Sequence, residues 1–596
     1  MAVEKLIVDH IDTWTTALQT RSTAGRGSSG KIDLYGIKKL RELILELAVR
    51  GKLVQQDPND EPASGLLKRI AQEKAQLVKD GKIKKQKPLP PISDEEKPFE
   101  LPEGWEWVRL SDVAEYIQRG KSPKYSEHGH VKVVSQKCVQ WNGFKLEQAR
   151  LITDKSVETY TEERFLKNGD ILWNSTGAGG TAGRIIYLPV VTEKLVVDSH
   201  VTLIRTIKQN GQFICNYIST YGIQQRFDPK HSNTLLSGTT NQAELNASVV
   251  TSFITPFPPQ KEQERINSKV TELMSLCDQL EQHSLTSLDA HQQLVETLLT
   301  TLTDSQNADE LAENWARISE HFDTLFTTEA SIDALKQTIL QLAVMGKLVP
   351  QDPNDEPAVE LLKRIEQEKA QLVKDGKIKK QKPLPPISDE EKPFELPDGW
   401  EWCKFGLISE FINGDRGSNY PNKNEYVVHG IPWINTGHIE KNGTLSITDM
   451  NFITEKKFNE LRSGKIQSGD LVYCLRGATF GKTAFVMPYE SGAIASSLMI
   501  IRPFIKEMGE HIYNYLISPF GRSQIFRFDN GSAQPNLSAN SVMLYAFACP
   551  PLQEQFRIHK KITELFHICD SLRLQTQSAQ QTQLHLADAL TDAAIN

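Results

Sequence analysis

The chain has 596 residues, too many for one hydrophobic core, so at least two domains are expected. Its 39% hydrophobic and 24% charged residues are typical of a soluble globular protein, and neither a membrane-spanning stretch nor a secretory signal is evident, so we expect no membrane partner. A net charge of −7 argues against a simple basic nucleic-acid binder, and seven cysteines without a CxxC pair favour a reducing, cytoplasmic location.

The dominant feature is an internal repeat. Residues 47–107 return at 342–402 with only six differences, and residues 258–280 resemble 550–572. The segments between these matched blocks diverge, although VKVVSQKCV (131–139) parallels IPWINTGHI (431–439) and NGDILWNSTG (168–177) parallels SGDLVYCLRG (468–477). Two copies of one unit predict a pseudo-two-fold arrangement rather than a solenoid.

The elements expected in chain order give a mixed α+β fold. Short β-rich runs alternate with helical runs in the divergent segments, whereas the proline-rich KPLPPISDEEKPFELP predicts an extended strap. The expected parts are a helical frame module (1–102), a first α/β domain (103–257), a long helix (258–303), a second frame module repeating 31–102 (304–397), a second α/β domain (398–549) and a second long helix (550–596).

The two long helices carry apolar residues in steps of four and three, which is typical of a coiled-coil seam. We expect the helices to bury the two seams against each other. The seam residues are Ile266, Val270, Leu273, Cys277 and Leu280 in the first helix and Ile558, Ile562, Leu565, Cys569 and Leu572 in the second.

Charge is unevenly distributed along the chain. Residues 108–257 carry a net +4 and residues 403–548 a net +2, whereas the helix 258–303 carries −4. A mild basic excess in the divergent domains is compatible with a phosphate-contacting face and equally with an ordinary protein surface.

Motifs for catalysis are weak. GATFGKT (477–483) resembles a phosphate-binding loop, but three residues separate its glycines where the Walker motif has four, and the paired copy GAGGTAGR lacks the Lys-Thr. His128 and His130 have no third ligand at a suitable spacing, so no metal site is expected. Without a nucleophile or zinc-protease signature, the chain is expected to be non-catalytic.

Polar and basic residues cluster at corresponding points of the two domains. Amide side chains can pair with adenine edges, and Arg or Lys with guanine edges or phosphates, so these residue types suit DNA readout, although each one alone is equally a solvated loop residue. The predicted DNA contacts are Lys121, Ser135, Gln136, Lys137, Asn174, Ser175, Arg184, Asn241 and Gln242 in the first domain and Arg416, Asn435, Thr436, His438, Arg476, Lys482, Gln534 and Asn536 in the second.

These features resemble the specificity subunits of type I restriction-modification systems. The resemblance covers the whole chain and rests on LPEGWEWVRLSDV and LPDGWEWCKF, IPWINTGHI, the two (N/S)GD(I/L) strands, GSAQPNLS, and the endings PFPPQKEQERI and ACPPLQEQFRI. VKVVSQKCV departs from the usual Pro-aromatic strand, so the residues chosen in the first domain are less well supported than those in 431–439.

The resemblance implies two target recognition domains, each reading one half of a split double-stranded DNA sequence in a bacterial or archaeal cell. It also implies that the long helices pair antiparallel, set the spacer and dock two methyltransferase subunits, which are joined by two ATP-dependent restriction subunits. S-adenosylmethionine, ATP and Mg²⁺ are expected on those partners and no cofactor on this chain. The alternatives are a nucleotide hydrolase using residues 477–483 and a coiled-coil scaffold that binds no DNA.

Overall fold

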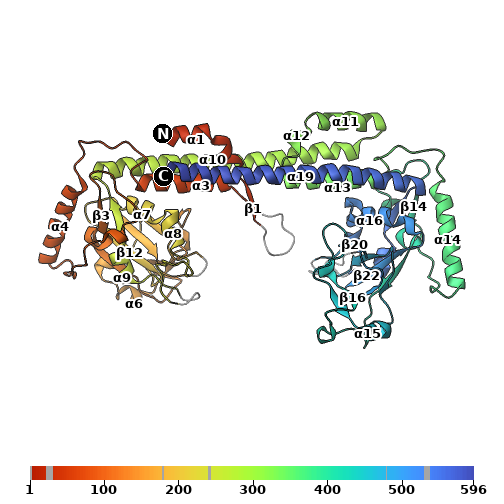
Figure 1. The fold of residues 1–596 in the computed structure, drawn as a ribbon. Coiled ribbons are helices and arrows are strands. Elements are labelled where there is room, and N and C mark those ends of the chain that lie inside the picture. Colours follow the sequence, from red (N-terminus) through yellow and green to blue (C-terminus); the bar gives the residue numbers. More distant parts are fainter. Residues whose placement is uncertain are drawn as a thin grey trace. The chain divides into compact units, whose positions relative to one another are not determined.

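The computed structural model describes residues 3–21, 31–177, 180–238, 243–477, 479–528 and 537–595. The chain divides into two compact units, which are drawn in Figure 1. Within the described residues, unit 1 comes from Met1–Arg21, Ile32–Leu285 and Gln580–Asn596, and unit 2 comes mainly from Thr286–Ala579.

Unit 1 contains a helical frame and a mixed domain. Its helices are α1 (Val3–Asp9), α2 (Ile11–Thr16), α3 (Tyr35–Val49), α4 (Ala63–Lys79), α5 (Leu110–Val113), α6 (Asp154–Val157), α7 (Gln212–Ile218), α8 (Tyr221–Gln225), α9 (Ala247–Ser252) and the first part of α10 (Gln260–Asp304). After a short pair formed by β1 (Gln19–Arg21) and β2 (Lys31–Asp33), its strands are β3 (Glu106–Arg109), β4 (Ala114–Arg119), β5 (Lys132–Val134), β6 (Val139–Gln140), β7 (Gly143–Phe144), β8 (Arg150–Leu151), β9 (Asp170–Asn174), β10 (Ile185–Leu188), β11 (Leu195–Val197), β12 (Val201–Thr206) and β13 (Ile254–Phe257).

Unit 2 repeats this plan. Its helices are the second part of α10, α11 (Ala308–Glu320), α12 (Phe322–Leu325), α13 (Glu329–Val344), α14 (Ala358–Lys374), α15 (Glu455–Glu460), α16 (Gly509–Ile517), α17 (Pro519–Phe526), α18 (Ala539–Met543) and most of α19 (Leu552–Ile595). Its strands are β14 (Glu401–Lys404), β15 (Ser409–Asn413), β16 (Ile431–Ile434), β17 (Asn451–Ile453), β18 (Lys465–Ile466), β19 (Leu471–Cys474), β20 (Thr483–Phe485), β21 (Gly492–Ile494), β22 (Leu498–Pro503) and β23 (Ala546–Cys549).

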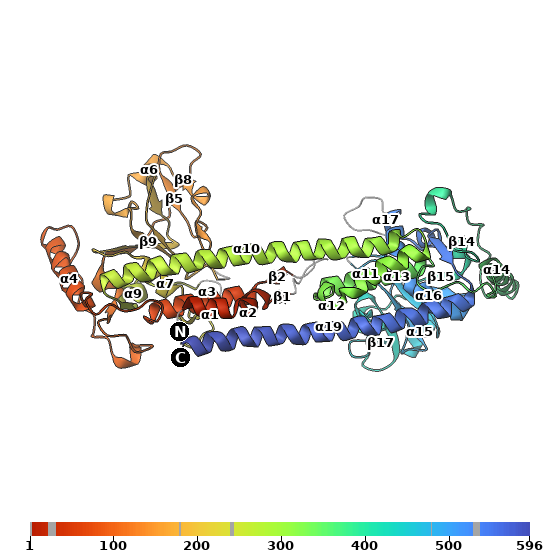
Figure 2. The same cartoon turned by 90° about the horizontal axis from the view of Figure 1, so that it is seen from above.

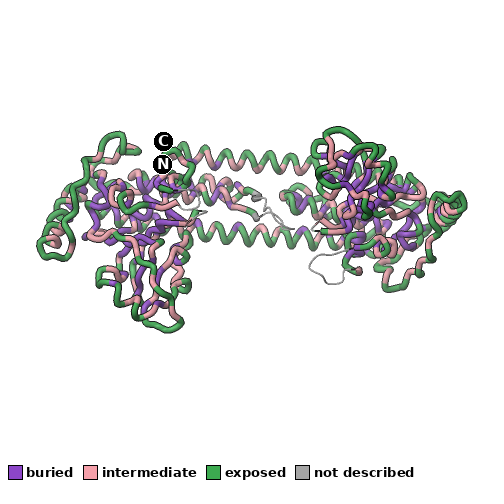
Figure 3. The backbone as a smooth tube through the Cα atoms, turned by 90° about the horizontal axis from the view of Figure 1, so that it is seen from below, coloured by how far each residue is buried: buried purple, intermediate pink, exposed green. Residues whose placement is uncertain are grey.

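Within the described residues, the two mixed domains share the order of their antiparallel sheet, whereas a second sheet has three strands in unit 1 and four in unit 2. An antiparallel sheet with the order β10-β9-β12-β4 in unit 1 corresponds to β20-β19-β22-β15 in unit 2. A second sheet has one parallel pair in each copy, β5 with β11 and β16 with β21. Buried residues gather inside each domain, as Figure 3 shows. The expected mixed fold and internal repeat are thus confirmed in three dimensions.

A buried ion pair anchors the central strand of each antiparallel sheet. Asp170, fully buried at the start of β9, accepts hydrogen bonds from Arg205 Nε (2.7 Å) and Nη2 (2.8 Å). Asp470, at the same place before β19, accepts from Arg502 Nε and Nη2, both at 2.8 Å. Such bidentate pairs compensate the desolvation of both charges, and losing one partner would leave the other buried and unpaired. The repeated Gly-Asp step therefore fixes the register of each sheet.

The two long helices, α10 with 45 residues and α19 with 44, each follow a Pro-Pro step. Proline is tolerated just before and at the start of a helix, where no intrahelical donor is needed. Each helix has its first part in one unit and its last part in the other. Within the described residues, no helix combines the length and apolarity that crossing a membrane requires.

Each seam packs against a frame helix. In unit 2, Ile558, Ile562 and Cys569 lie in one buried cluster with residues of α13 and of the second part of α10. In unit 1, Ile266 and Cys277 of the first seam are fully buried. Figure 2 shows α3 beside α10. The cluster residues contributed by α13 and α10 are Ile332, Leu335, Ile339, Leu340, Leu342, Ala343, Val295, Leu299 and Leu302.

Ion pairs mark the same arrangement in both copies. Arg41 of α3 contacts Asp278 of α10 at 2.7 Å, and Lys336 of α13 contacts Asp570 of α19 at 2.5 Å. The expected direct pairing of the two seams is therefore wrong. The heptad pattern identifies a buried stripe but not its partner, and the apolar faces of the frame helices cover it instead.

The junction between each mixed domain and the start of its long helix, which we call the neck, contains a tryptophan–glutamate hydrogen bond. Trp105 Nε1 donates to Glu262 Oε2 and Trp400 Nε1 donates to Glu554 Oε2, both at 3.0 Å. The chain enters on β3 and leaves on β13, which pair antiparallel, as do β14 and β23. Both glutamates are almost fully buried in the first turn of a long helix, and burial raises their pKa values. The neck thus fixes each domain to the start of its helix.

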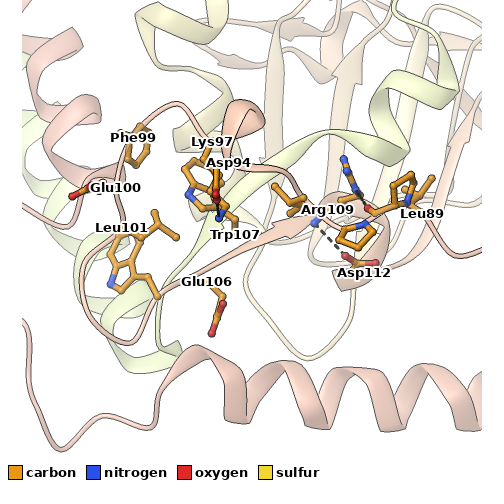
Figure 4. Close-up of a pocket in the computed structure, with 14 residues that line it drawn as sticks. Leu89, Asp94, Lys97, Phe99, Glu100, Leu101, Glu106, Trp107, Arg109 and Asp112 are labelled. Atoms are coloured by element: carbon orange, nitrogen blue, oxygen red, sulfur yellow. Dashed lines mark hydrogen bonds and ion pairs between the residues drawn. The ribbon is translucent and has the colours of Figure 1, made fainter.

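The proline-rich strap is extended, as predicted, and folds back on the neck. In unit 1 the strap and β3 line a groove (Figure 4), in which Arg109 donates to Pro90 O (3.1 Å), Ser252 O (2.9 Å) and the Glu96 carboxylate. In unit 2, Lys404 and Arg527 donate to Glu391 at 2.6 and 2.7 Å. Burial alone would raise the pKa of Glu391, but these hydrogen bonds and that from Ser388 N lower it to about 2.

The two necks differ in one aromatic position, which generates a prediction. His511 packs edge-on against Trp400, where Phe213 packs against Trp105 in the first copy. Burial lowers the pKa of His511 to about 4, against an ordinary value of 6.5. Because the unfolded chain binds this proton more readily, the free energy of unfolding of unit 2 should fall by up to about 3 kcal/mol as the pH drops from 6.5 to 4.

The matched variant is His511→Phe, which copies the first neck. It should abolish this part of the acid sensitivity of unit 2, measured by thermal denaturation between pH 4 and 7.5. An unchanged pH dependence in the variant would show that other groups control the acid response.

Candidate nucleic-acid interface

The interface is built on the end of the central strand of each domain. Strands β9 and β19 are buried along their whole length, and each is followed by a glycine-rich turn that leads into the next strand. Asn174 N donates to Arg184 O and Cys474 N donates to Lys482 O, both at 2.8 Å. Arg184 and Lys482 therefore occupy the same position in the two copies, and both are half-buried.

The two turns also require glycine at a second pair of equivalent positions. Gly183 and Gly481 have positive φ values of 92° and 77°, and their N–H groups donate to Asn174 O and Cys474 O. A Cβ at Gly183 would lie 2.5 Å from the Phe227 ring. Only glycine fits this conformation and this space, so the turn backbone is held close to the sheet.

Asn174 and Ser175 are not exposed. Both side chains are fully buried, so their prediction as DNA contacts is wrong. Asn174 Nδ2 donates to Gln136 O (3.2 Å), Val139 O (3.4 Å) and Thr181 O (3.3 Å), and so holds two loops together. Ser175 Oγ pairs with the Thr202 hydroxyl on the neighbouring strand. Both residues position the surface rather than form it.

Arg476 corresponds to Thr176 and not to Asn174 or Ser175. Asp170 and Asp470 hold the same place in the two copies, as their ion pairs show, so the sixth following residue is Thr176 in one copy and Arg476 in the other. Thr176 Oγ1 lies 2.5 Å from His200 Nδ1, whereas Arg476 is half-buried. The alignment of NGDILWNSTG with SGDLVYCLRG already contained this pairing, so the sequence could have identified Thr176.

The loop after β5 carries three predicted contacts. Ser135 and Gln136 are half-buried and Lys137 is exposed. Ser135 Oγ accepts from Lys137 N at 3.3 Å, which shapes the turn. Gln140, the next polar side chain, donates from Nε2 to Lys137 O (2.9 Å) and accepts from Arg184 Nη1. The loop and the Arg184 turn therefore form one surface.

In the second copy the corresponding loop follows β16. Asn435 caps a short turn by accepting from Gly437 N at 2.8 Å, and both Asn435 and Thr436 are half-buried. His438 is only 4% exposed and its Nδ1 accepts from Asn435 N at 3.1 Å. Burial lowers the pKa of His438, so it is neutral at pH 7 and supports the loop. Its prediction as a surface contact is wrong.

Two further predicted cations, one in each mixed domain, are exposed. Lys121 is exposed, and its ammonium lies 2.5 Å from Thr159 O and 5.6 Å from the Tyr160 ring centroid. Arg416 is exposed beside Asp415, which accepts from Gly417 N and Arg462 N, both at 2.7 Å. These hydrogen bonds lower the pKa of Asp415 and hold the loop in place. The predicted contacts Asn241, Gln242, Gln534 and Asn536 lie outside the described residues.

The glycine-rich segment 477–483 does not have the fold of a phosphate loop. A Walker loop leads from a strand into a helix, whose N-terminal N–H groups bind the phosphate. Here the segment joins β19 to β20, which pair antiparallel as a hairpin. The alternative of a nucleotide hydrolase is therefore unsupported. Within the described ranges, no group of three or more His, Cys, Asp or Glu side chains is placed to hold a metal ion.

The surface offers cations and amides. In the first copy it presents Lys137, Arg184 and Gln136, and in the second Arg476, Lys482 and Asn435. Arg and Lys attract phosphates and guanine edges, and amides pair with adenine edges. Where backbone positions correspond, at Arg184 and Lys482, at Thr176 and Arg476, and at Ser135 and Asn435, the side chains differ between the copies.

The family is shown by comparison with known proteins. A family model for the type I restriction modification DNA specificity domain matches residues 102–290 and 397–579. The chain belongs to this family of type I restriction specificity subunits.

The most similar relatives include two Escherichia coli proteins that match over their full length. The chain is 50% identical to the specificity subunit of the type I restriction enzyme EcoAI and 48% identical to that of EcoEI, with 100% of each chain covered. Among solved structures, the HsdS subunit of Thermoanaerobacter tengcongensis matches with 16% identity and a TM-score of 0.39, covering 84% of this chain and 98% of that chain. A structure concerning assembly of the type I R-M system matches with 17% identity and a TM-score of 0.46, covering 84% and 99%.

Removing the buried amide tests its positioning role. Asn174→Ala leaves the carbonyls of Gln136, Val139 and Thr181 without this donor, so we expect unit 1 to lose about 1–3 kcal/mol of unfolding free energy. Hydrogen exchange should also become faster in the peptides covering 131–145 and 175–185. Lys137→Ala, an exposed neighbour, is the matched control and should change neither. Unaltered exchange in Asn174→Ala would contradict the assignment.

Proposed function

We propose that this specificity subunit reads a split double-stranded DNA sequence, one half with each mixed domain. The observation that carries the proposal is that one scaffold occurs twice with different side chains at equivalent points, such as the half-buried Arg184 and Lys482, or the buried Thr176 and the half-buried Arg476. The mixed domains hold a net positive charge within an acidic chain, which favours phosphates. We refer to the mixed domains below as recognition domain 1 (103–257) and recognition domain 2 (398–549).

Within this proposal the residues have distinct roles. Lys121, Lys137, Arg184, Arg416, Arg476 and Lys482 are proposed to contact phosphates or guanine edges, and Gln136 and Asn435 to contact base edges. Asn174, Ser175 and His438 hold the loops that carry them. The chain itself performs no catalysis in this proposal.

The proposed partners are those of a type I restriction-modification complex. The frame modules are nearly identical in the two copies, so each can bind the same kind of subunit. We propose two methyltransferase subunits on the frame and two restriction subunits in the larger complex. S-adenosylmethionine, ATP and Mg²⁺ would be bound by those partners. The alternative of a scaffold that binds no DNA is not supported, because the family model that matches both mixed domains is that of a DNA specificity domain. A gel-shift titration of the full-length chain with random duplex tests DNA binding directly.

The proposal predicts that specificity is modular. Replacing residues 403–548 by the corresponding segment of a relative should change one half of the methylated motif, because the frame on either side is retained. The reciprocal replacement of 108–257 should change the other half. Sequencing methylated adenines in cells that express each chimera measures both. A chimera in which both halves change would contradict independent reading.

A truncation uses the repeat in another way. In unit 1, Tyr35 Oη donates to Asp588 at 2.7 Å and Lys39 lies 3.2 Å from the same carboxylate near the end of α19. The second part of α10 carries Glu296 at the position equivalent to Asp588. A chain ending near residue 328 should therefore form a two-fold dimer, in which the second part of α10 from one copy replaces that of α19 in the other.

With its methyltransferase, such a dimer should modify an inverted repeat of the first half-site. Sedimentation gives the oligomeric state and methylome sequencing gives the motif. Tyr35→Phe in the truncated chain removes the hydroxyl that would bind Glu296 of the other copy, so this variant should form a weaker dimer. A monomer, or a dimer that methylates a non-palindromic site, would show that the two long helices are not interchangeable.

A further inference from the structure

A short hairpin projects from the interface of recognition domain 1. Strands β6 and β7 pair through Val139 with Phe144 and Gln140 with Gly143, so Trp141 and Asn142 form the tip. Gly143, directly after the tip, has a φ of 109°, a conformation that favours glycine and completes the reversal of the chain. Val139 is fully buried in the domain core, and Phe144 packs against the same cluster. The base of the hairpin is packed into the domain core, and its tip projects from the domain surface.

Trp141 is exposed at this tip. Its exposed fraction is 54%, whereas Trp173 in the same domain is fully buried. An exposed tryptophan leaves a large apolar area in water, and such residues are most useful where a partner covers them. The fold does not use this indole for its own core.

The neighbours of Trp141 are those of the proposed DNA surface. The preceding residue, Gln140, accepts a hydrogen bond from Arg184 and donates to Lys137 O at 2.9 Å. Val139, two residues before Trp141, accepts from the buried Asn174 amide at 3.4 Å. The hairpin is therefore tied to both basic loops, and its tip stands beside two cations.

The second copy has a corresponding hairpin, whose pairing leaves one more residue in the tip. Ile439 bridges Leu445, Glu440 N donates to Thr444 O at 2.9 Å, and Gly443 has a φ of 80°. Lys441 stands where the first copy has Trp141, and it is exposed. The corresponding hairpins thus present an indole in one domain and an ammonium in the other.

We propose that Trp141 is a DNA-contacting residue of recognition domain 1 and packs its indole against a base in the groove of the first half-site. Aromatic side chains bury a large area on a base at low entropic cost, and apolar side chains can enter between base steps. The adjacent Lys137 and Arg184 neutralise the phosphates on either side. Lys441 makes a phosphate contact at the equivalent point of the second half-site. This inference rests on the proposed function and adds a specificity-determining residue to it.

Binding of full-length variants tests the inference. The probe is a labelled duplex that carries the motif obtained by methylome sequencing. Trp141→Ala should weaken binding by about 10- to 100-fold, and Trp141→Phe should restore most of it, because a ring is retained. Trp315→Ala is the matched control, since Trp315 is a 36% exposed tryptophan on α11 of unit 2 and belongs to neither recognition domain. It should bind like the wild type.

Salt dependence separates the two tips. Lys441→Ala should reduce the slope of the logarithm of the binding constant against the logarithm of salt concentration by about one, because one phosphate contact is lost. Trp141→Ala should leave the slope unchanged, because stacking releases no counterions.

Fluorescence gives an independent readout. The wild-type spectrum minus that of Trp141→Phe isolates the emission of Trp141, which the target duplex should quench and a duplex with a scrambled first half should not. Wild-type affinity in Trp141→Ala together with unquenched Trp141 emission would overturn the inference while the proposed function stands. If the wild type binds the target duplex no more tightly than random DNA, the proposed function fails as well.

Discussion

In both copies an indole N–H donates to a carboxylate that is almost fully removed from water, in the first turn of a long helix. A buried charge is costly unless it is well paired, so the Trp105–Glu262 and Trp400–Glu554 bonds permit little variation in how the chain enters and leaves each recognition domain. A neighbouring ion pair reinforces each neck. Arg265 pairs with Asp60 at 2.7 Å in unit 1, and Arg557 pairs with Asp355 at 2.6 Å in unit 2. Because the neck is fixed, the domain beyond it can change without disturbing the frame.

The interface follows the same division between support and surface. Buried polar residues, such as Asn174 in the first copy and His438 in the second, hold loops whose exposed side chains differ between copies. The supporting groups are themselves different, an amide in one domain and a neutral imidazole in the other, yet Arg184 and Lys482 emerge at the same backbone position. Changing a reading residue therefore need not involve the sheet that carries it.

The sequence predicted the repeat, the long helices, the extended strap and the corresponding strands, because each leaves a periodic or near-verbatim signal. It did not predict the partner of the seam residues, since α3 and α13 offer apolar faces as suitable as the other seam. It also misplaced Asn174, Ser175 and His438, because polar residues next to apolar strands look like loop residues. Their burial depends on carbonyl groups from distant loops, which a local pattern does not contain. Trp141 gave no motif, and only its exposure at a rigid tip distinguishes it.

The near-identity of the two frame modules has a consequence for the gene. Residue 47 corresponds to residue 342, and 61 consecutive positions match except for six, so homologous recombination within the chain's own coding sequence preserves the reading frame. Deletion between equivalent points joins α3 and the first strap to the second domain and α19. In that half-length product, residues of α3 take the positions of their equivalents in α13. Arg41 replaces Lys336, which pairs with Asp570, and Ile37 and Leu40 replace Ile332 and Leu335. The frame is thus a joint at which whole recognition domains can be lost, gained or exchanged with related genes, without any new side-chain packing having to evolve.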